Sequence, residues 1–350
     1  AILQVNVPPE RDVVLENEDI RLVFSTRGGV ITEAVMKRFN GPDNRQRAQL
    51  VSPGQTWLDG AILDGDDDIP LANLVFTPAI TSADTLVLTA ELAGGQTVLK
   101  EFTLEKTGYM LRSKTTLGGK WIDPRLKFSF HGSLNKTEPD FRQIRIWPFS
   151  MFMRDEKNMY DELVFMGEGD RIINGNGKER TKRIYSHDGG QKIQPRKTVR
   201  GLETFSGDLT WYAVKNKYFI LSAIPREGKR WKAETSYEQT TAGNWYDFAI
   251  EKRVSEGAVD LMLYIGPSSY RELKAYGHQL TQTMDLSWKI LRPISILFIW
   301  MFRQIHRFVP NWGLVLIVFS VIIKIALYPL SQSSMNSMKK MSKLQPKISA

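Results

Sequence analysis

Apolar and polar residues alternate along most of the first 285 positions of the chain. The alternation is clear at Ile20–Ser25, Leu86–Leu92, Leu126–Phe130 and Val259–Ile265. Successive side chains of a strand point to opposite faces of a sheet, so this period of two predicts half-buried strands. Pairs of glycines separate many of these stretches and supply the positive φ that tight turns need: Gly28-Gly29, Gly94-Gly95, Gly118-Gly119 and Gly189-Gly190. The pattern therefore predicts a mainly β fold with a large antiparallel sandwich over residues 1–285.

Two segments depart from the alternation within this domain. Tyr218–Ile224 is almost continuously apolar, which predicts a central strand buried on both faces. Ser269 and Glu272 have the spacing of a helix capping box, and Leu273, Tyr276 and Leu280 follow at helical spacing. A short helix is therefore expected to close the domain.

A different pattern begins at Leu286. The apolar run Ile294–Phe302 has nine residues, too few for the roughly 20 that a membrane-spanning helix needs. The run is flanked by Lys289, Arg292, Arg303 and Arg307, with Trp288 and Trp300 among the apolar residues. This composition is typical of a helix lying in the membrane interface. An amphipathic interfacial helix is expected over residues 286–310, with a buried core helix as the alternative.

The next segment is long enough to cross a membrane. Twelve of the 19 residues in Gly313–Ser331 are Leu, Ile, Val or Phe. Such residues contribute about −0.3 to −0.6 kcal/mol each to insertion, whereas one lysine costs about 3 kcal/mol. The balance predicts one transmembrane helix over residues 311–331. The segment 332–350 carries four lysines and no acidic residue, which favours a cytoplasmic location.

Lys324 lies inside this apolar helix. Ser320 and Tyr328 are four residues before and after it, so the three side chains share one helix face. Placing a charged residue within a membrane-spanning segment costs free energy, and such residues are usually functional. This favours a polar groove with these three residues as its substrate-binding side chains. A lysine that merely extends its ammonium toward the membrane surface is the alternative.

The amino-acid composition further narrows the possible functions of the protein. Residues 286–350 contain nine Lys or Arg and no Asp or Glu, so they carry the whole net charge of +9. A basic excess among apolar residues indicates membrane contact rather than nucleic-acid binding. The chain has no cysteine, which excludes thiolate metal sites and a thiol nucleophile. No cofactor or metal is expected. His131 and His187 could serve a carbohydrate-active site, but no carboxylate is recognisable as their partner.

With these residues in view, the chain resembles the YidC family of membrane protein insertases of Gram-negative bacteria. The most specific similarity lies in NWG at Asn311–Gly313, YPL at Tyr328–Leu330 and QPKI at Gln345–Ile348. TRGG at Thr26–Gly29 and YIGP at Tyr264–Pro267 resemble segments of the family's large domain. The resemblance implies a piece of a longer protein: a periplasmic β-supersandwich (1–285), an amphipathic interfacial helix (286–310), the second membrane helix (311–331) and the start of a cytoplasmic helical hairpin (332–350).

The same resemblance implies a non-enzymatic insertase and chaperone of the bacterial inner membrane, with its large domain in the periplasm. The family has a hydrated, positively charged intramembrane groove, whose usual arginine is replaced here by Lys324. The implied partners are nascent membrane proteins, the SecYEG translocon, SecDF, the ribosome or targeting factors, and membrane lipid. A membrane-anchored carbohydrate-active enzyme and a passive periplasmic adaptor are the alternative functions.

Overall fold

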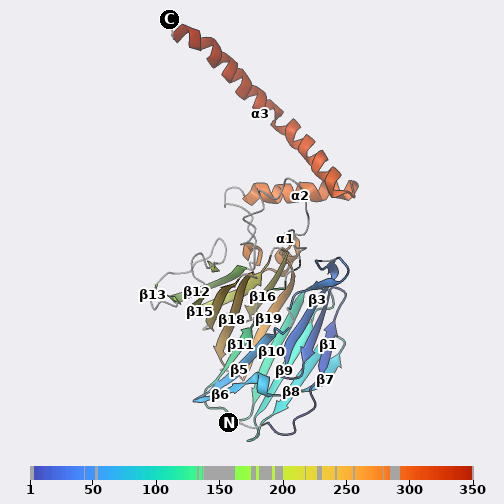
Figure 1. Ribbon diagram of the computed structural model, residues 1–350, viewed down its shortest axis with the longest axis vertical. Coiled ribbons are helices and arrows are strands. Elements are labelled where there is room, and N and C mark those ends of the chain that lie inside the picture. The colour runs from blue at the N-terminus through green and yellow to red at the C-terminus, as the bar shows by residue number, and fades with distance from the viewer. Residues whose placement is uncertain are drawn as a thin grey trace. The chain divides into compact units, whose positions relative to one another are not determined.

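The computed structural model describes residues 4–42, 44–51, 54–131, 134–135, 137, 162–174, 179–180, 191–193, 200–216, 218–226, 231–240, 243–254, 257–278, 280–283 and 292–348. The chain divides into two compact units, Ala1–Met284 and Asp285–Ala350. The first unit is built mainly from strands and the second from helices (Figure 1).

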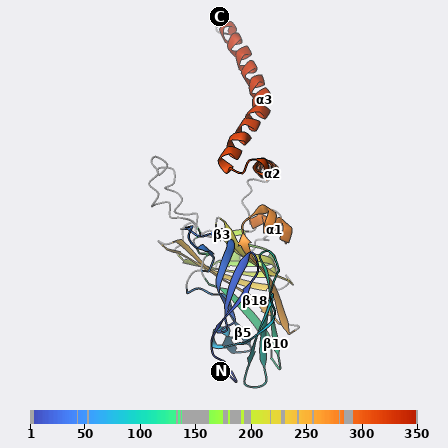
Figure 2. The same cartoon turned by 90° about the vertical axis from the view of Figure 1, so that its right-hand side faces the viewer.

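Antiparallel strands form two layers in the first unit (Figures 1 and 2). One layer follows the hydrogen-bonded order β7-β8-β9-β10-β19-β16, and the other follows β1-β2-β3-β5-β11-β18-β17. The strand bounds are β1 Asp12–Glu16, β2 Ile20–Ser25, β3 Val30–Asn40, β4 Arg47–Gln49, β5 Trp57–Asp64, β6 Asp67–Pro70, β7 Thr77–Ser82, β8 Thr85–Glu91, β9 Thr97–Leu104, β10 Met110–Gly118, β11 Pro124–Phe130, β12 Glu162–Asn174, β13 Glu179–Arg180, β14 Gln191–Ile193, β15 Arg200–Lys215, β16 Phe219–Pro225, β17 Trp231–Thr240, β18 Gly243–Arg253 and β19 Ala258–Pro267.

The long strand β15 connects the two layers. Its first half, from Arg200 to Gly207, pairs with β17, and its second half, from Tyr212 to Lys215, pairs with β16. One strand therefore belongs to both sheets, which holds them together at that side. The mainly β, antiparallel sandwich predicted from the alternation is confirmed.

Aromatic rings fill the space between the layers. Phe24 of β2 and Phe102 of β9 come from opposite layers, and their ring centroids lie 4.6 Å apart. Phe130 of β11 stacks on Phe248 of β18 at 4.4 Å, and Tyr212 of β15 lies 5.0 Å from Phe248. Burial of apolar surface is the main favourable term in folding, and each such ring contributes a large area.

Both exceptions to the alternation form the predicted elements, a buried strand and a short helix, but the predicted cap of the helix was wrong. Every residue of β16 is buried, as the continuous apolar run predicts, except that Tyr218, the first residue of that run, precedes the strand and is exposed. Helix α1 spans Tyr270–Tyr276, but Ser269 makes no side-chain capping hydrogen bond, so the capping-box prediction was wrong. Gly277, at φ 72°, ends the helix, and Leu280 lies beyond it in a separate 3₁₀ turn, Leu280–Thr283.

Two helices make up the described part of the second unit: α2, Arg292–Phe308, and α3, Trp312–Ile348. Within α3, the 18 residues Trp312–Pro329 are long and apolar enough to cross a membrane. The helix continues past Pro329 without a break for a further 19 residues. Trp288 and Lys289, which contributed to the interfacial prediction, lie outside the described residues.

Candidate functional site

The three residues predicted to line a groove all lie on α3, and all three are exposed. Ser320, Lys324 and Tyr328 are spaced by four, so each is displaced by about 40° round the helix from the one before. The ammonium of Lys324 makes no hydrogen bond or ion pair with any residue within the described ranges. The stripe thus lies on an open face of the helix.

A different face of α3 packs on α2. The ring of Phe319 lies 4.2 Å from that of Phe302 and 5.3 Å from that of Phe298, measured between centroids. Val315, one turn earlier on α3, is fully buried. Lys324 follows Val315 by nine residues, which places it about 180° round the helix. The polar stripe therefore faces away from α2 and is available to other elements or to a ligand.

The NWG motif forms the corner between the two helices. The side-chain oxygen of Asn311 accepts hydrogen bonds from the backbone N–H groups of Gly313, at 2.8 Å, and Leu314, at 3.4 Å. These bonds satisfy donors that a helix N-terminus leaves without a partner. Trp312 stacks on His306 of α2, with centroids 3.9 Å apart and planes 15° apart. Capping and stacking together fix where the long helix begins.

His131, a candidate for a carbohydrate-active site, has a carboxylate partner that the sequence did not reveal. Its Nε2 lies 3.7 Å from Oδ2 of Asp59, on β5. The pKa of Asp59 is lowered overall: burial raises it, but the neighbouring His131, the Gly60 N–H and the charge of Lys100 more than offset that effect. His187 lies outside the described residues.

Asp59 is also the counter-ion of a lysine buried between the layers. Lys100, on β9, is 1% exposed, and its ammonium donates to the carbonyl oxygens of Gly28 (2.7 Å), Gly29 (3.0 Å) and Leu58 (3.3 Å). These carbonyls belong to the opposite layer, so the lysine links the two sheets across the core. Burial lowers the pKa of Lys100 to about 7, and the charge of Asp59 opposes that effect. The arrangement gives Asp59 and the TRGG turn a structural role.

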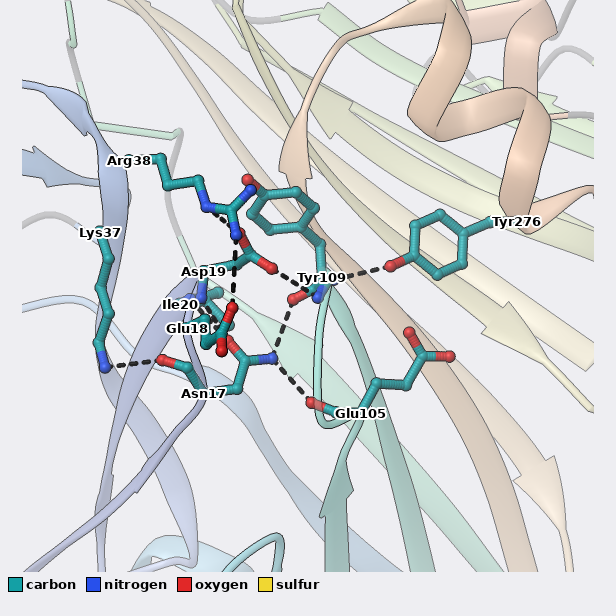
Figure 3. Close-up of polar contacts among 10 residues, drawn as sticks. Asn17, Glu18, Asp19, Ile20, Lys37, Arg38, Glu105, Tyr109 and Tyr276 are labelled. Carbon is teal, nitrogen blue, oxygen red and sulfur yellow. Dashed lines mark hydrogen bonds and ion pairs between the residues drawn. The ribbon is translucent and has the colours of Figure 1, made fainter.

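A polar network fastens α1 to the end of the sandwich (Figure 3). The amide of Asn17 donates to the carbonyl oxygens of Glu105, at 2.7 Å, and Gly108, at 3.0 Å. The hydroxyl of Tyr276, from α1, accepts the backbone N–H of Tyr109 at 2.8 Å. Burial raises the pKa of Tyr276 to about 12. The bond to Tyr109 therefore holds α1 against the end of the sandwich, and the sequence pattern that predicted the helix did not indicate this contact.

The observations so far define a class of protein: one with a large β-sandwich followed by a short amphipathic helix and a helix able to cross a membrane. Comparison with known families makes the assignment specific. Residues 12–301 match the family model described as the YidC periplasmic domain, and residues 304–350 match the model described as 60Kd inner membrane protein. The chain belongs to the YidC family. Its sandwich is accordingly the periplasmic domain of an inner-membrane protein.

Curated relatives carry the name membrane protein insertase YidC. The protein from Prosthecochloris aestuarii is 26% identical over 96% of this chain and 56% of its own length. The protein from Chlorobium luteolum is 39% identical over 42% of this chain and 26% of its own length. The chain thus spans at most about half the length of these two relatives. Among solved structures, a galactose mutarotase-like protein from Lactobacillus casei is 11% identical, with a TM-score of 0.49 over 73% of this chain and 100% of that chain.

Proposed function

We propose that this chain belongs to a membrane protein insertase in which the stripe Ser320, Lys324 and Tyr328 lines a hydrated groove within the membrane. The observation that carries the proposal is the position of Lys324. It lies on an apolar helix, about 180° from the buried Val315, with polar side chains one turn above and below it.

The chemistry of the stripe suits a polypeptide entering the bilayer. Polar groups that leave water for hydrocarbon without a hydrogen-bond partner cost several kcal/mol each. The Lys324 ammonium offers donors and a positive charge to acidic side chains and carbonyl oxygens, and the two hydroxyl groups both donate and accept. Partial hydration along this face would lower the barrier to moving polar segments. Such assistance requires no covalent step, so the proposed role is non-enzymatic.

The proposal also includes an assignment of the chain's segments to the two sides of the membrane. Residues 1–285 would be the periplasmic domain, 286–310 an interfacial helix, 311–331 the membrane helix, and 332–350 the start of a cytoplasmic hairpin. The apolar side chains exposed on α2 support the interfacial assignment, among them Ile294, Leu297 and Trp300.

Family membership supports nascent membrane proteins as substrates. SecYEG, SecDF and the ribosome or targeting factors are proposed as partners on the family resemblance alone, and membrane lipid on the apolar exposure of α2 and α3. The family also disfavours the two alternative functions, a carbohydrate-active enzyme and a passive adaptor, because its curated members carry the insertase name.

The test is complementation by the full-length protein in cells depleted of their own insertase, with protein levels checked by immunoblot. Lys324→Arg should keep activity because the charge survives, whereas Lys324→Leu should insert well but lose activity. The matched control is Lys324→Leu combined with Ile325→Lys, which restores the charge about 100° away on an exposed position. Full activity of Lys324→Leu would refute the groove assignment. Rescue by the relocated lysine would show that charge alone, rather than its position in the stripe, matters.

A further inference from the structure

Pro329 stands within a continuous helix, at the end of the apolar segment of α3. Helix α3 runs from Trp312 to Ile348, so Pro329 has helical residues on both sides. Proline has no backbone N–H and cannot donate to the carbonyl four residues earlier. The carbonyl oxygen of Ile325 therefore lacks the donor that a regular helical position provides.

This carbonyl lies on the helix face next to the polar stripe, since Ile325 is about 100° round the helix from Lys324. A helical C=O points along the axis toward the residue four positions later, so the oxygen of Ile325 lies next to Pro329. Pro329 directly follows Tyr328, about 100° round the helix. The surroundings are open, since Ile325 is 69% exposed and Tyr328 is 62% exposed.

The chemistry of this group complements that of Lys324. A crossing polypeptide carries backbone N–H donors as well as carbonyl acceptors. The ammonium of Lys324 can only donate, whereas a backbone carbonyl can only accept. An acceptor next to the stripe supplies what the lysine cannot, and it does so without adding a second charge to the membrane.

We propose that the Ile325 carbonyl, freed by Pro329, is a hydrogen-bond acceptor for the backbone N–H groups of a polypeptide segment passing the stripe. This rests on the proposed insertase function and adds a substrate feature to it. The site would recognise the peptide group itself, in an extended and not yet helical segment, so recognition would not depend on the side chains of the substrate.

The first experiment separates the acceptor from the bend that a proline introduces. Pro329→Ala restores the N–H and should slow insertion of a reporter membrane protein by about threefold to about twentyfold, the range of one hydrogen bond within a membrane. Pro329→Gly also restores the N–H but keeps flexibility, and it should be equally slow. The control Pro329→Ala combined with Leu330→Pro keeps a proline but frees the carbonyl of Ala326 instead. Its proline lies about 200° from Tyr328, and it should also be slow.

Normal insertion by any of these three variants, at equal protein levels, would overturn the proposal. Normal rates for the shifted proline alone would show that the bend is what matters. The proposed function is tested separately, since Lys324→Leu should be inactive whether or not the acceptor is used.

The second experiment observes the carbonyl directly. The sequence Ile–Ala occurs once in these 350 residues, at 325–326. Carbonyl-¹³C isoleucine together with ¹⁵N alanine therefore gives one such signal from these residues, and in the full-length protein it is identified by its loss in Ala326→Val. Adding a synthetic peptide of a single-span membrane protein to the full-length protein in nanodiscs should shift this signal in the wild type. The same peptide should leave it unmoved in Pro329→Ala. No shift in the wild type, with binding of the peptide confirmed, would overturn the proposal.

Discussion

The buried lysine of the sandwich gives the sharpest stability prediction. Lys100→Met removes the ammonium while keeping an unbranched side chain of similar length between the layers. The pKa of Lys100 is about 7 in the folded protein, against 10.5 for an ordinary lysine. The difference of about 3.5 units corresponds to about 5 kcal/mol, at 1.36 kcal/mol per unit.

The direction of the pH dependence follows from proton uptake. Between pH 7 and 10.5 the unfolded chain holds the Lys100 proton and the folded domain does not, so the free energy of unfolding rises with pH in this interval. The lysine therefore favours the fold most above pH 10.5, and that advantage is lost as the pH falls to about 7. Buried tyrosines act in the opposite direction above pH 10, because Tyr109 and Tyr276 keep their protons to about pH 12 when folded. The useful window is therefore pH 7 to 9.5, across which the contribution of Lys100 to the free energy of unfolding changes by about 3 kcal/mol.

Urea unfolding of residues 1–284 provides the assay, followed by the fluorescence of the buried tryptophans Trp57, Trp211 and Trp231. The stability of the wild type relative to Lys100→Met should rise by about 3 kcal/mol across this window. Lys114→Met, on the neighbouring strand β10, is the matched control and should parallel the wild type. A constant difference between wild type and Lys100→Met would refute the argument that burial lowers the lysine pKa.

Three further predictions address other contacts. Tyr276→Phe removes the acceptor for the Tyr109 N–H, so unfolding of the domain should become easier by about 1 kcal/mol, measured by the same urea assay. Asn311→Ala removes the cap of α3 and should lower the free energy of unfolding of the protein in nanodiscs by about 1 kcal/mol, seen as a lower Tm, whereas Asn311→Asp should keep the wild-type Tm. A cysteine replacing Arg303 in this cysteine-free sequence should react with a membrane-impermeant maleimide from the periplasmic side, and labelling from the cytoplasm would contradict the interfacial assignment of α2.

The strands were predictable because their signal is local. In β8 and β11 the alternation matches the observed burial almost residue by residue, since one face of each strand packs on the core. The same logic could have revealed Lys100. It occupies an inward position of β9, between Val98 and Phe102, which are both fully buried. A charged residue at an inward-facing position of a strand can be recognised from the sequence. The carbonyl groups that it binds cannot, because they come from distant segments.

Contacts distant in sequence were not predictable. Asp59 and His131 are 72 positions apart, and they meet because β5 pairs with β11 in a register that sets Asp59 opposite Ser129. Nothing in either segment alone specifies that register. The capping-box prediction failed for a related reason: the spacing of Ser269 and Glu272 is compatible with a cap, but tertiary contacts at Tyr276 hold α1 in place instead. On α3 the spacing alone brought the predicted stripe together on one exposed face.

Two lysines in apolar surroundings illustrate how a structural charge differs from a candidate functional one. Lys100 has three backbone carbonyls and a carboxylate around it, so its hydrogen-bonding capacity is used within the fold. Lys324 lies on an apolar helix with only hydroxyl-bearing neighbours along its face, and no described residue bonds to its ammonium. A charge at that depth is unfavourable without a partner or water. The interactions that Lys324 does not make within the described residues are the ones that the proposed groove would offer to a substrate.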